Sequence, residues 1–323
     1  MNTRALFFGV IVSGLTNTFA YAQSDYPNKP IAIVVPGAPG GGGDFTARLL
    51  ADDLSKALGK PVVVENRAGA GGNIAATYVA RAQPDGYTLL LAYSGTHVVN
   101  PAMFNNLLWD PVQSFVPIAL LITSPQVIAI SNKVPAKTLS EFVVWAKANP
   151  GKINYASSGN GSVQHIGSEL LAMRTGVEMV HVPYKGAGAA LTDVLSGQID
   201  LLITTPPALV SHLRAGNLRA LAIASKQRHA MLPDVPTTSE SGINDVELDA
   251  WFALYAPTGT PSTIVKRLTI EIEKIVQSTL FQRRAEEAGT YATYLDSAQL
   301  ENFTRTELLY WSAVIQKLKI KSE

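Results

Sequence analysis

Short apolar runs alternate with amphipathic stretches along most of the chain. The run 31–35 is continuously apolar, as expected for a strand buried in a sheet. The stretch 44–58 instead carries its apolar residues on one helical stripe, with Asp44 suited to cap its start and Gly59 to end it. Further strands are predicted at 62–65, 88–93, 126–131, 153–156, 178–182, 199–203, 218–224 and 250–256, and further helices at 74–82, 139–148, 163–175, 187–195, 261–278 and 297–319. This rhythm predicts an α/β fold with a mostly parallel sheet.

The strand–helix series occurs twice, and a helical tail follows. A chain of this length usually divides into two domains. We predict a first lobe formed by 23–124 and 247–323, and a second lobe formed by 125–246. The chain would then cross between the lobes at two hinge points, near Ser124 and near Val246.

The N-terminus carries the pattern of a secretory signal peptide. Arg4 precedes an apolar stretch, 5–15, and the triplet Ala-Tyr-Ala at 20–22 offers small residues at the positions a signal peptidase requires. We therefore predict cleavage before Gln23, which makes 1–22 a signal peptide and the mature protein periplasmic. The alternatives are a short buried helix and a membrane anchor. The apolar stretch is too short to span a bilayer and is followed by polar residues.

Charge and cysteine content restrict the classes of partner. The chain has 26 Lys and Arg against 25 Asp and Glu, and loss of Arg4 with the signal peptide leaves 25 against 25. A neutral protein has no bulk field that attracts nucleic acid or an anionic membrane, so recognition must come from a local site. No cysteine is present, which excludes disulfides and thiol chemistry.

The strongest local feature is a glycine-rich loop between the first predicted strand and helix. Glycines allow tight turns and let a ligand approach main-chain N–H groups, which at a helix start favour an anion. The alternative is a flexible connector without a ligand. The loop is neither a Walker loop, because no Gly-Lys-Ser/Thr follows, nor a dinucleotide fingerprint. The candidate ligand contacts here are Ala38, Gly40, Gly41, Gly42, Gly43 and Asp44.

A second loop of the same kind precedes the helix predicted at 163–175. Its hydroxyls, amide and N–H groups would hold a carboxylate without a buried cation, which avoids the desolvation penalty of a charge. The alternative is ordinary capping of the helix by its serine. The candidates are Ser157, Ser158, Asn160, Ser162 and His165.

Other candidates follow strands in both lobes. Ser94, Thr96 and His97 come at the end of the strand 88–93, where ligands bind in open α/β sheets. For both His97 and His165 a purely structural role is an equal alternative. Tyr184 would form a wall of the cleft, or else pack at a turn. A structural ion pair is favoured over a ligand contact for Arg67.

Arrangements typical of enzymes and metal proteins are absent from the sequence. No Gly-x-Ser-x-Gly elbow occurs, and the five histidines do not have metal-ligand spacing. We therefore predict that the protein is not an enzyme and holds no metal or cofactor. An α/β enzyme acting on a small carboxylate remains the main alternative, because an active site can be assembled only in three dimensions.

From about Tyr26 to its C-terminus, the chain resembles the Bug family, the substrate-binding receptors of tripartite tricarboxylate transporters. Each motif is weak alone, but their order and spacing together are specific. They are YPNKP at 26–30, PGAPGGGGD at 36–44, VVVENR at 62–67 followed by GAGGN at 69–73, PDGYT at 84–88, NYASSGNG at 154–161, HVPYKG at 181–186 and LPDVPT at 232–237.

The resemblance implies a periplasmic binding protein of type II, the two-lobed "Venus flytrap", without enzymatic activity. It implies membrane transporter subunits as partners, and a ligand carboxylate held by the loops 38–44 and 157–165, partly through ordered waters. No nucleic acid is expected as a partner, and we expect a monomer. A sensor that docks on a membrane signalling protein is a further alternative.

Two departures from relatives concern the ligand. Many relatives have Phe in place of Gly37 and Ser or Thr in place of Gly43, and many have Asp-Asn where this chain has Thr204 and Thr205. If these positions border the cleft, its walls are wider here and an acceptor for a ligand ammonium is missing. We therefore count Thr204 and Thr205 among the expected ligand contacts. The hypothesis that follows is a dicarboxylate, bulkier than an amino acid and conceivably aromatic, such as terephthalate.

Overall fold

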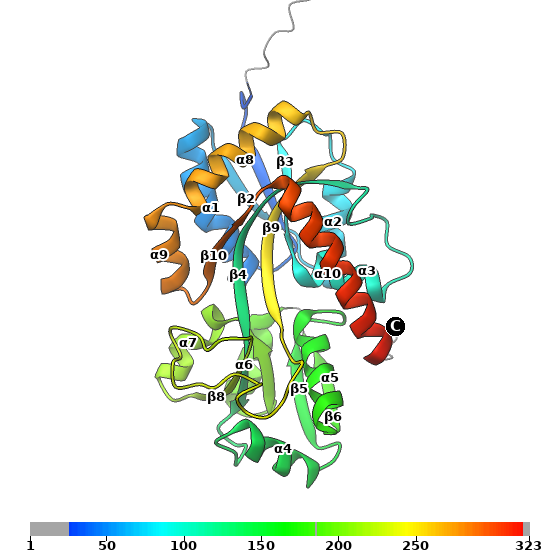
Figure 1. The fold of residues 1–323 in the computed structure, drawn as a ribbon, viewed down its shortest axis with the longest axis vertical. Helices are drawn as coiled ribbons and strands as arrows, with labels where there is room; N and C mark the ends of the chain where they lie inside the picture. Colours follow the sequence, from blue (N-terminus) through cyan, green and yellow to red (C-terminus); the bar gives the residue numbers. More distant parts are fainter. Residues whose placement is uncertain (1–25, 185, 319–323) are drawn as a thin grey trace, which may run out of the picture.

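The computed structural model describes residues 26–184 and 186–318, so the predicted signal peptide lies outside the described residues. Two lobes are joined by two long strands, β4 (Phe115–Ser131) and the more central β9 (Asp249–Pro257) (Figure 1). The first lobe contains β1 (Ile31–Val35), α1 (Gly42–Leu58), β2 (Val62–Asn66), η1 (Ala70–Gly72), α2 (Asn73–Ala80), β3 (Thr88–Tyr93), the π-helix η2 (Gly95–Val99), α3 (Asn100–Met103), α8 (Ser262–Val276), α9 (Thr279–Glu287), β10 (Tyr291–Leu295) and α10 (Ser297–Leu318). The second lobe contains α4 (Leu139–Lys147), β5 (Ile153–Ser157), α5 (Val163–Thr175), β6 (Met179–Pro183), α6 (Ala187–Ser196), β7 (Leu201–Thr204), α7 (Pro206–Arg214) and β8 (Leu218–Ala224).

Strand β4 belongs to the sheets of both lobes. As far as Pro125 it pairs with β9, and from Gln126 onward it pairs with β8 and then β7. The described strands therefore follow the order β2-β1-β3-β9-β4-β10 in the first lobe and β6-β5-β7-β4-β8 in the second. The chain returns beside the same point, where the Leu248 N–H donates to the Ala224 carbonyl (2.8 Å).

The prediction of a mostly parallel sheet is wrong. Pairs β1–β2, β1–β3, β5–β6 and β5–β7 are parallel, but every described pair that includes β4 or β9 is antiparallel. The sequence pattern also missed α7, α9, β10 and the first half of β4. Pro117 and Pro125 interrupt that half, and proline is a poor strand signal because it cannot donate to a ladder.

Apolar residues cover both faces of each sheet. One core packs β1 and β3 against α1 and α8, and another packs β5 and β7 against α6 and α7. A third core runs through both lobes along β4 and takes in Trp311 and Ile315 of α10. In Figure 1 this last helix descends across the front of the first lobe toward α5. Among residues 26–184 and 186–318, none of the helices has both the length and the apolar character needed to cross a bilayer.

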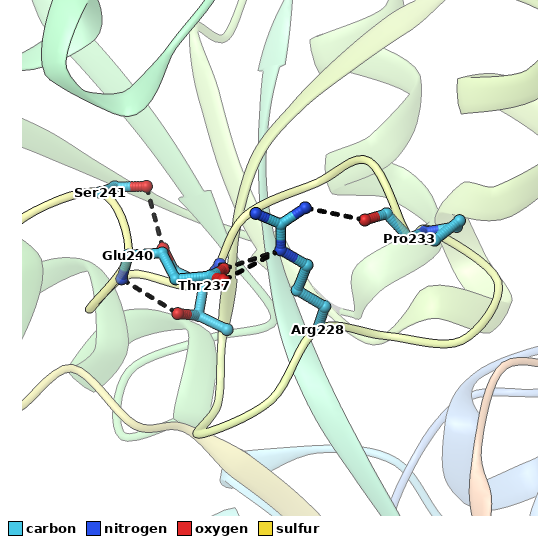
Figure 2. Close-up of polar contacts among 5 residues, drawn as sticks. All are labelled: Arg228, Pro233, Thr237, Glu240 and Ser241. Atoms are coloured by element: carbon cyan, nitrogen blue, oxygen red, sulfur yellow. Dashed lines mark hydrogen bonds and ion pairs between the residues drawn. The ribbon is translucent and has the colours of Figure 1, made fainter.

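The return segment between β8 and β9 is braced by a polar network (Figure 2). The Arg228 guanidinium pairs with Glu240 (Nε–Oε2 2.8 Å) and donates to the Pro233 carbonyl (3.0 Å). Thr237 and Glu240 form a reciprocal capping arrangement, in which the N–H of each residue donates to the side chain of the other. The segment between β8 and β9 is thus stabilised by its own hydrogen bonds. A parallel β-bridge between Ile223 and Thr237 also connects it to β8.

Candidate ligand-binding site

A cleft of about 2410 Å³ lies where the two lobes face each other. The first lobe contributes residues 35–44 and 68–74, and the second contributes Ser158, Gly159, Asn160, Val163, Gln164, Pro183, Tyr184, Gly186, Gly188, Ala189, Thr204, Thr205 and Ala208. Ala250 and Phe252 of β9 and Gln126 of β4 also line it, near the strands that cross between the lobes. Helices α1, α2, α5, α6 and α7 each begin at or directly beside a residue that lines this cleft.

The glycine loop presents the start of α1 to the cleft. Gly41 is the N-cap residue, and no side chain caps the helix at this end. The first intrahelical bond runs from the Phe45 N–H to the Gly41 carbonyl (3.0 Å), so the preceding N–H groups of the first turn have no helical partner. These donors and the helix dipole favour an anion from the cleft.

Asp44 shapes this loop and does not act as an anion-binding group. Its carboxylate accepts from the Gly40 N–H (3.0 Å) and pairs with the Arg48 guanidinium (3.0 Å). Desolvation alone would raise the pKa of Asp44, but the hydrogen bonds from Arg48 and the Gly40 N–H hold that pKa below its usual range. The carboxylate is therefore ionised and partly neutralised within the loop, although the residue lines the cleft.

Helix starts at the cleft differ from two helix starts elsewhere. Like α1, helices α2, α6 and α7 begin at the cleft without a side-chain cap. Helices α4 and α9, outside the cleft, are capped by Thr138 and Ser278. At α1, α2 and α6 the absence of a side-chain cap leaves first-turn N–H groups available to a ligand, whereas α7 begins with Pro206 and Pro207, which have no N–H. At α5 the Ser162 hydroxyl caps the His165 N–H (3.3 Å), as the capping alternative predicted.

The second-lobe loop is supported from beneath by a stack of rings. The imidazoles of His165 and His181 stack with centroids 4.0 Å apart and planes at 7°, and the Tyr155 ring lies nearly parallel to both, 4.9 Å from His181 and 6.4 Å from His165. Two hydrogen bonds connect this stack to the loop. The Gly161 N–H donates to His165 Nδ1 (3.2 Å), and Ser157 Oγ lies 2.6 Å from His181 Nε2. Ser158 and Asn160 line the cleft, whereas Ser157, Ser162 and His165 are buried beside it and hold the loop in place.

Both histidines of the stack are neutral near pH 7. Burial lowers the pKa of His165 to about 4, and the neighbouring His181 contributes in the same direction. Burial likewise lowers the pKa of His181 to about 4. Ser157 and His181 form a hydrogen-bonded pair, but Ser157 is fully buried and no described carboxylate pairs with His181. The arrangement therefore lacks the exposed nucleophile and the orienting acid of a hydrolase.

The residues predicted after β3 lie behind the cleft wall. Ser94, Thr96 and His97 are fully buried and do not line the cleft, so they are corrected from ligand contacts to core residues. The Thr96 hydroxyl donates to the Gly71 carbonyl (3.0 Å). His97 packs among aromatic rings, including that of Tyr255 at 4.2 Å, and burial lowers its pKa to about 3. The π-helix that follows β3 turns these side chains inward, which strand periodicity does not predict.

Other predicted residues do line the cleft. They are Ala38, Gly40, Gly41, Gly42, Gly43, Tyr184, Thr204 and Thr205. The Tyr184 hydroxyl donates to Asp193 (2.5 Å). Arg67 does not line the cleft; it pairs with Glu65 (3.2 Å) and lies over the ring of Tyr78, so the structural role expected for it is confirmed.

Gly37 and Gly43, which stand where many relatives have larger residues, differ in the space around them. A β-carbon at Gly37 would meet no atom within 4 Å, so a side chain there would extend into open space at the cleft. At Gly43 a β-carbon would lie 3.2 Å from Val35 Cγ1 and 3.6 Å from the Phe252 ring, both in the core of the first lobe. At Gly37 the missing side chain thus leaves open space in the cleft, whereas at Gly43 a β-carbon would press on Val35.

Sequence reasoning missed several lining residues. Phe252 was assigned only to a buried strand, but its ring lines the cleft and lies over Tyr93 with centroids 6.2 Å apart. Gln126 gave no signal, because a single amide at the end of an element resembles an ordinary surface residue. The only described cations that line the cleft are Lys29 and Arg81, both exposed residues of the first lobe, and Lys29 is paired with Asp85 (3.1 Å).

Two α/β lobes, two crossing strands and an interlobe cleft with uncapped helix starts define a solute-binding protein. Residues 46–320 match the model of the TctC family, the "Tripartite tricarboxylate transporter family receptor", and the chain belongs to this family. It is a periplasmic binding protein, not an enzyme, and among the described residues no cluster of His, Asp and Glu could hold a metal ion.

Solved structures share the whole fold. The periplasmic binding protein BugD is 34% identical with a TM-score of 0.88, over 92% of this chain and 100% of its own. An R. palustris protein solved with adipate is 32% identical with a TM-score of 0.89, over 92% and 99%. MatC from Rhodopseudomonas palustris, solved with bound malate, is 34% identical with a TM-score of 0.85, over 90% and 100%. These matches confirm the predicted fold class.

Proposed function

We propose that this receptor captures a small organic dicarboxylate in the interlobe cleft and delivers it to the membrane subunits of a tripartite tricarboxylate-type transporter. One observation carries the proposal: the uncapped start of α1 and the second-lobe residues Ser158 and Asn160 line the same interlobe cleft. A carboxylate between them would receive neutral N–H donors from both lobes without a buried cation. The adipate and malate found in the two relatives belong to the same chemical class.

Ligand capture works by closure of the two lobes, whose predicted bounds are 23–124 with 247–323 and 125–246. The change of partner along β4 at Gln126 supports a hinge at that point. Contacts to both lobes exist only in the closed form, so the ligand shifts the population toward it. A micromolar dissociation constant corresponds to about 8 kcal/mol, of which a few charge-assisted hydrogen bonds at roughly 1.5–3 kcal/mol each would supply a large part.

The room at Gly37 and the aromatic floor of Phe252 and Tyr93 support a ligand with a sizeable carbon skeleton. Native mass spectrometry of the protein as purified will show which acid it carries. Calorimetric titration with adipate, citrate, terephthalate and aspartate will then rank the classes. Binding of at least one dicarboxylate is expected. Binding of aspartate alone contradicts the dicarboxylate assignment, and no binding of any carboxylate rejects the proposed function.

A further inference from the structure

Gln126 holds an unusual position in the cleft wall. It lies in β4 at the point where the strand leaves the first-lobe sheet and enters that of the second lobe. Gln126 is one of the residues that line the cleft, although only 1% of its surface is exposed. Its Oε1 atom has no hydrogen-bond partner in the described part of the chain. A buried amide oxygen without a hydrogen-bond donor is energetically unfavourable. A ligand that donates a hydrogen bond to it would remove this penalty.

Thr205 completes a polar subsite with Gln126. Strands β4 and β7 pair Val127 with Thr204, and continuing this antiparallel register places Gln126 opposite Thr205. Thr205 also lines the cleft, and its hydroxyl does not cap the helix that it precedes. A β-carbon at Gly42 would lie 3.6 Å from Thr205 Oγ1, so the subsite adjoins the first turn of α1.

The chemistry of this pair selects the group that it can bind. Neither side chain carries a charge, so a ligand ammonium would be desolvated without a compensating anion. A ligand hydroxyl can donate to the amide oxygen and accept from the threonine hydroxyl, since it is both donor and acceptor. Because the subsite adjoins the α1 start, that hydroxyl must lie close to the carboxylate bound there.

We propose that Gln126 is a specificity-determining residue that binds a hydroxyl group next to the ligand carboxylate, and that the receptor prefers hydroxycarboxylates. This inference rests on the function proposed above. An acid without the hydroxyl, such as succinate or terephthalate, leaves the amide oxygen unpaired. Sites built to bind a substrate hydroxyl reject analogues that lack it more strongly than apolar pockets reject a missing methylene.

The test uses three acids with the same four-carbon skeleton: L-malate, succinate and L-aspartate, which carry a hydroxyl, a hydrogen and an ammonium at one position. Calorimetry on the wild type should show malate bound at least about tenfold more tightly than succinate and than aspartate. In Gln126→Leu, which keeps the side-chain volume similar, malate affinity should fall about tenfold while succinate affinity stays the same or rises. A purely structural role would weaken all three acids together.

Ser124→Ala is the matched control. Its hydroxyl is also buried without a described partner in the same part of β4, but Ser124 does not line the cleft. This variant should keep the wild-type ratio of malate to succinate affinity. An unchanged ratio in Gln126→Leu, or a wild type that binds succinate or aspartate as tightly as malate, overturns the inference. A wild type that binds adipate or terephthalate but none of the four-carbon acids also overturns it, yet leaves the proposed function standing; a protein that binds no carboxylate rejects both.

Discussion

Gly161 of the second lobe packs directly against Asn100 of the first. A β-carbon at Gly161 would lie 3.0 Å from Asn100 Oδ1 and 3.2 Å from Met103 Sδ. Nearby, a β-carbon at Gly71 would lie 3.4 Å from the Asn160 carbonyl oxygen, again across the cleft. The two lobes therefore contact each other at Gly161 and Gly71. Because neither residue has a side chain, the backbones of the two lobes can approach closely at these points.

Replacing Gly161 by alanine should disfavour the closed form. The added methyl group would meet Asn100 at a distance tighter than ordinary van der Waals contact, so the lobes would have to separate. We expect ligand affinity, measured by calorimetry, to fall about tenfold, because the closed form that binds the ligand is then less populated.

Gly151→Ala controls for backbone strain. Both glycines have a positive φ, +79° for Gly161 and +68° for Gly151, where a β-carbon costs about 1–2 kcal/mol. A β-carbon at Gly151 would meet nothing within 4 Å. Both variants should lose similar stability, but only Gly161→Ala should lose affinity; equal affinities in the two variants would contradict the closure role.

Gly41→Asp should separate stability from binding. Gly41 has a φ of −81°, which any residue adopts, and its β-carbon would meet only the Ala38 carbonyl at 3.5 Å. A carboxylate there would cap α1, which contributes about 1 kcal/mol, and would occupy the donors that the ligand needs. We expect a melting temperature no lower than that of the wild type, together with a loss of affinity of at least about tenfold.

The converse control is Thr138→Ala. It removes the cap of α4, which lies away from the cleft, so it should lower stability by about 1 kcal/mol and leave affinity unchanged. Retained affinity in Gly41→Asp would show that the start of α1 does not hold the ligand.

Gly37→Phe should narrow the cleft without disturbing the fold. The position faces open space at the cleft, so the ring can be accommodated. We expect a nearly unchanged melting temperature and a weaker affinity for the bulkiest acid bound, by about tenfold or more, measured by thermal-shift titration. Gly43→Phe should behave oppositely and destabilise the protein, because its side chain would enter the core beside Val35. Equal effects of the two substitutions on melting temperature would contradict this assignment.

His181 makes stability depend on pH. Its pKa is about 4 in the folded protein against an ordinary value near 6.5, so the unfolded chain binds the proton more readily. Above pH 6.5 the imidazole is neutral in both states and costs nothing; as the pH falls from about 6.5 to 4, stability is lost, by on the order of 2 kcal/mol.

His181→Gln keeps an amide near Ser157 but removes this titration. Its melting temperature should fall less between pH 7 and pH 4 than that of the wild type. His212→Gln, on α7 and outside the ring stack, should follow the wild-type curve. A His181→Gln curve parallel to the wild type would rule out this source of pH dependence.

The loops of the candidate site were visible in the sequence. Four consecutive glycines at the start of an amphipathic helix predict that a ligand can come close to the main chain. Ser162 directly before α5 predicts an N-cap for that helix. The direction of individual side chains was not visible. Ser157 and His97 are as polar as Ser158 and Asn160, but only the hydrogen bond between Ser157 and His181 and the turn of η2 decide that these two residues are buried.

The sequence by itself determined the two-lobed α/β class, most element positions, the family resemblance and the position of the glycine- and serine-rich helix starts, because periodicity and glycine patterns are local properties. Only the tertiary structure decided the antiparallel crossing through β4 and β9, the buried histidines and the place of Gln126 in the cleft wall. Strand pairing and side-chain burial depend on contacts between segments far apart in the chain. A local sequence pattern does not specify which distant segment it will pack against.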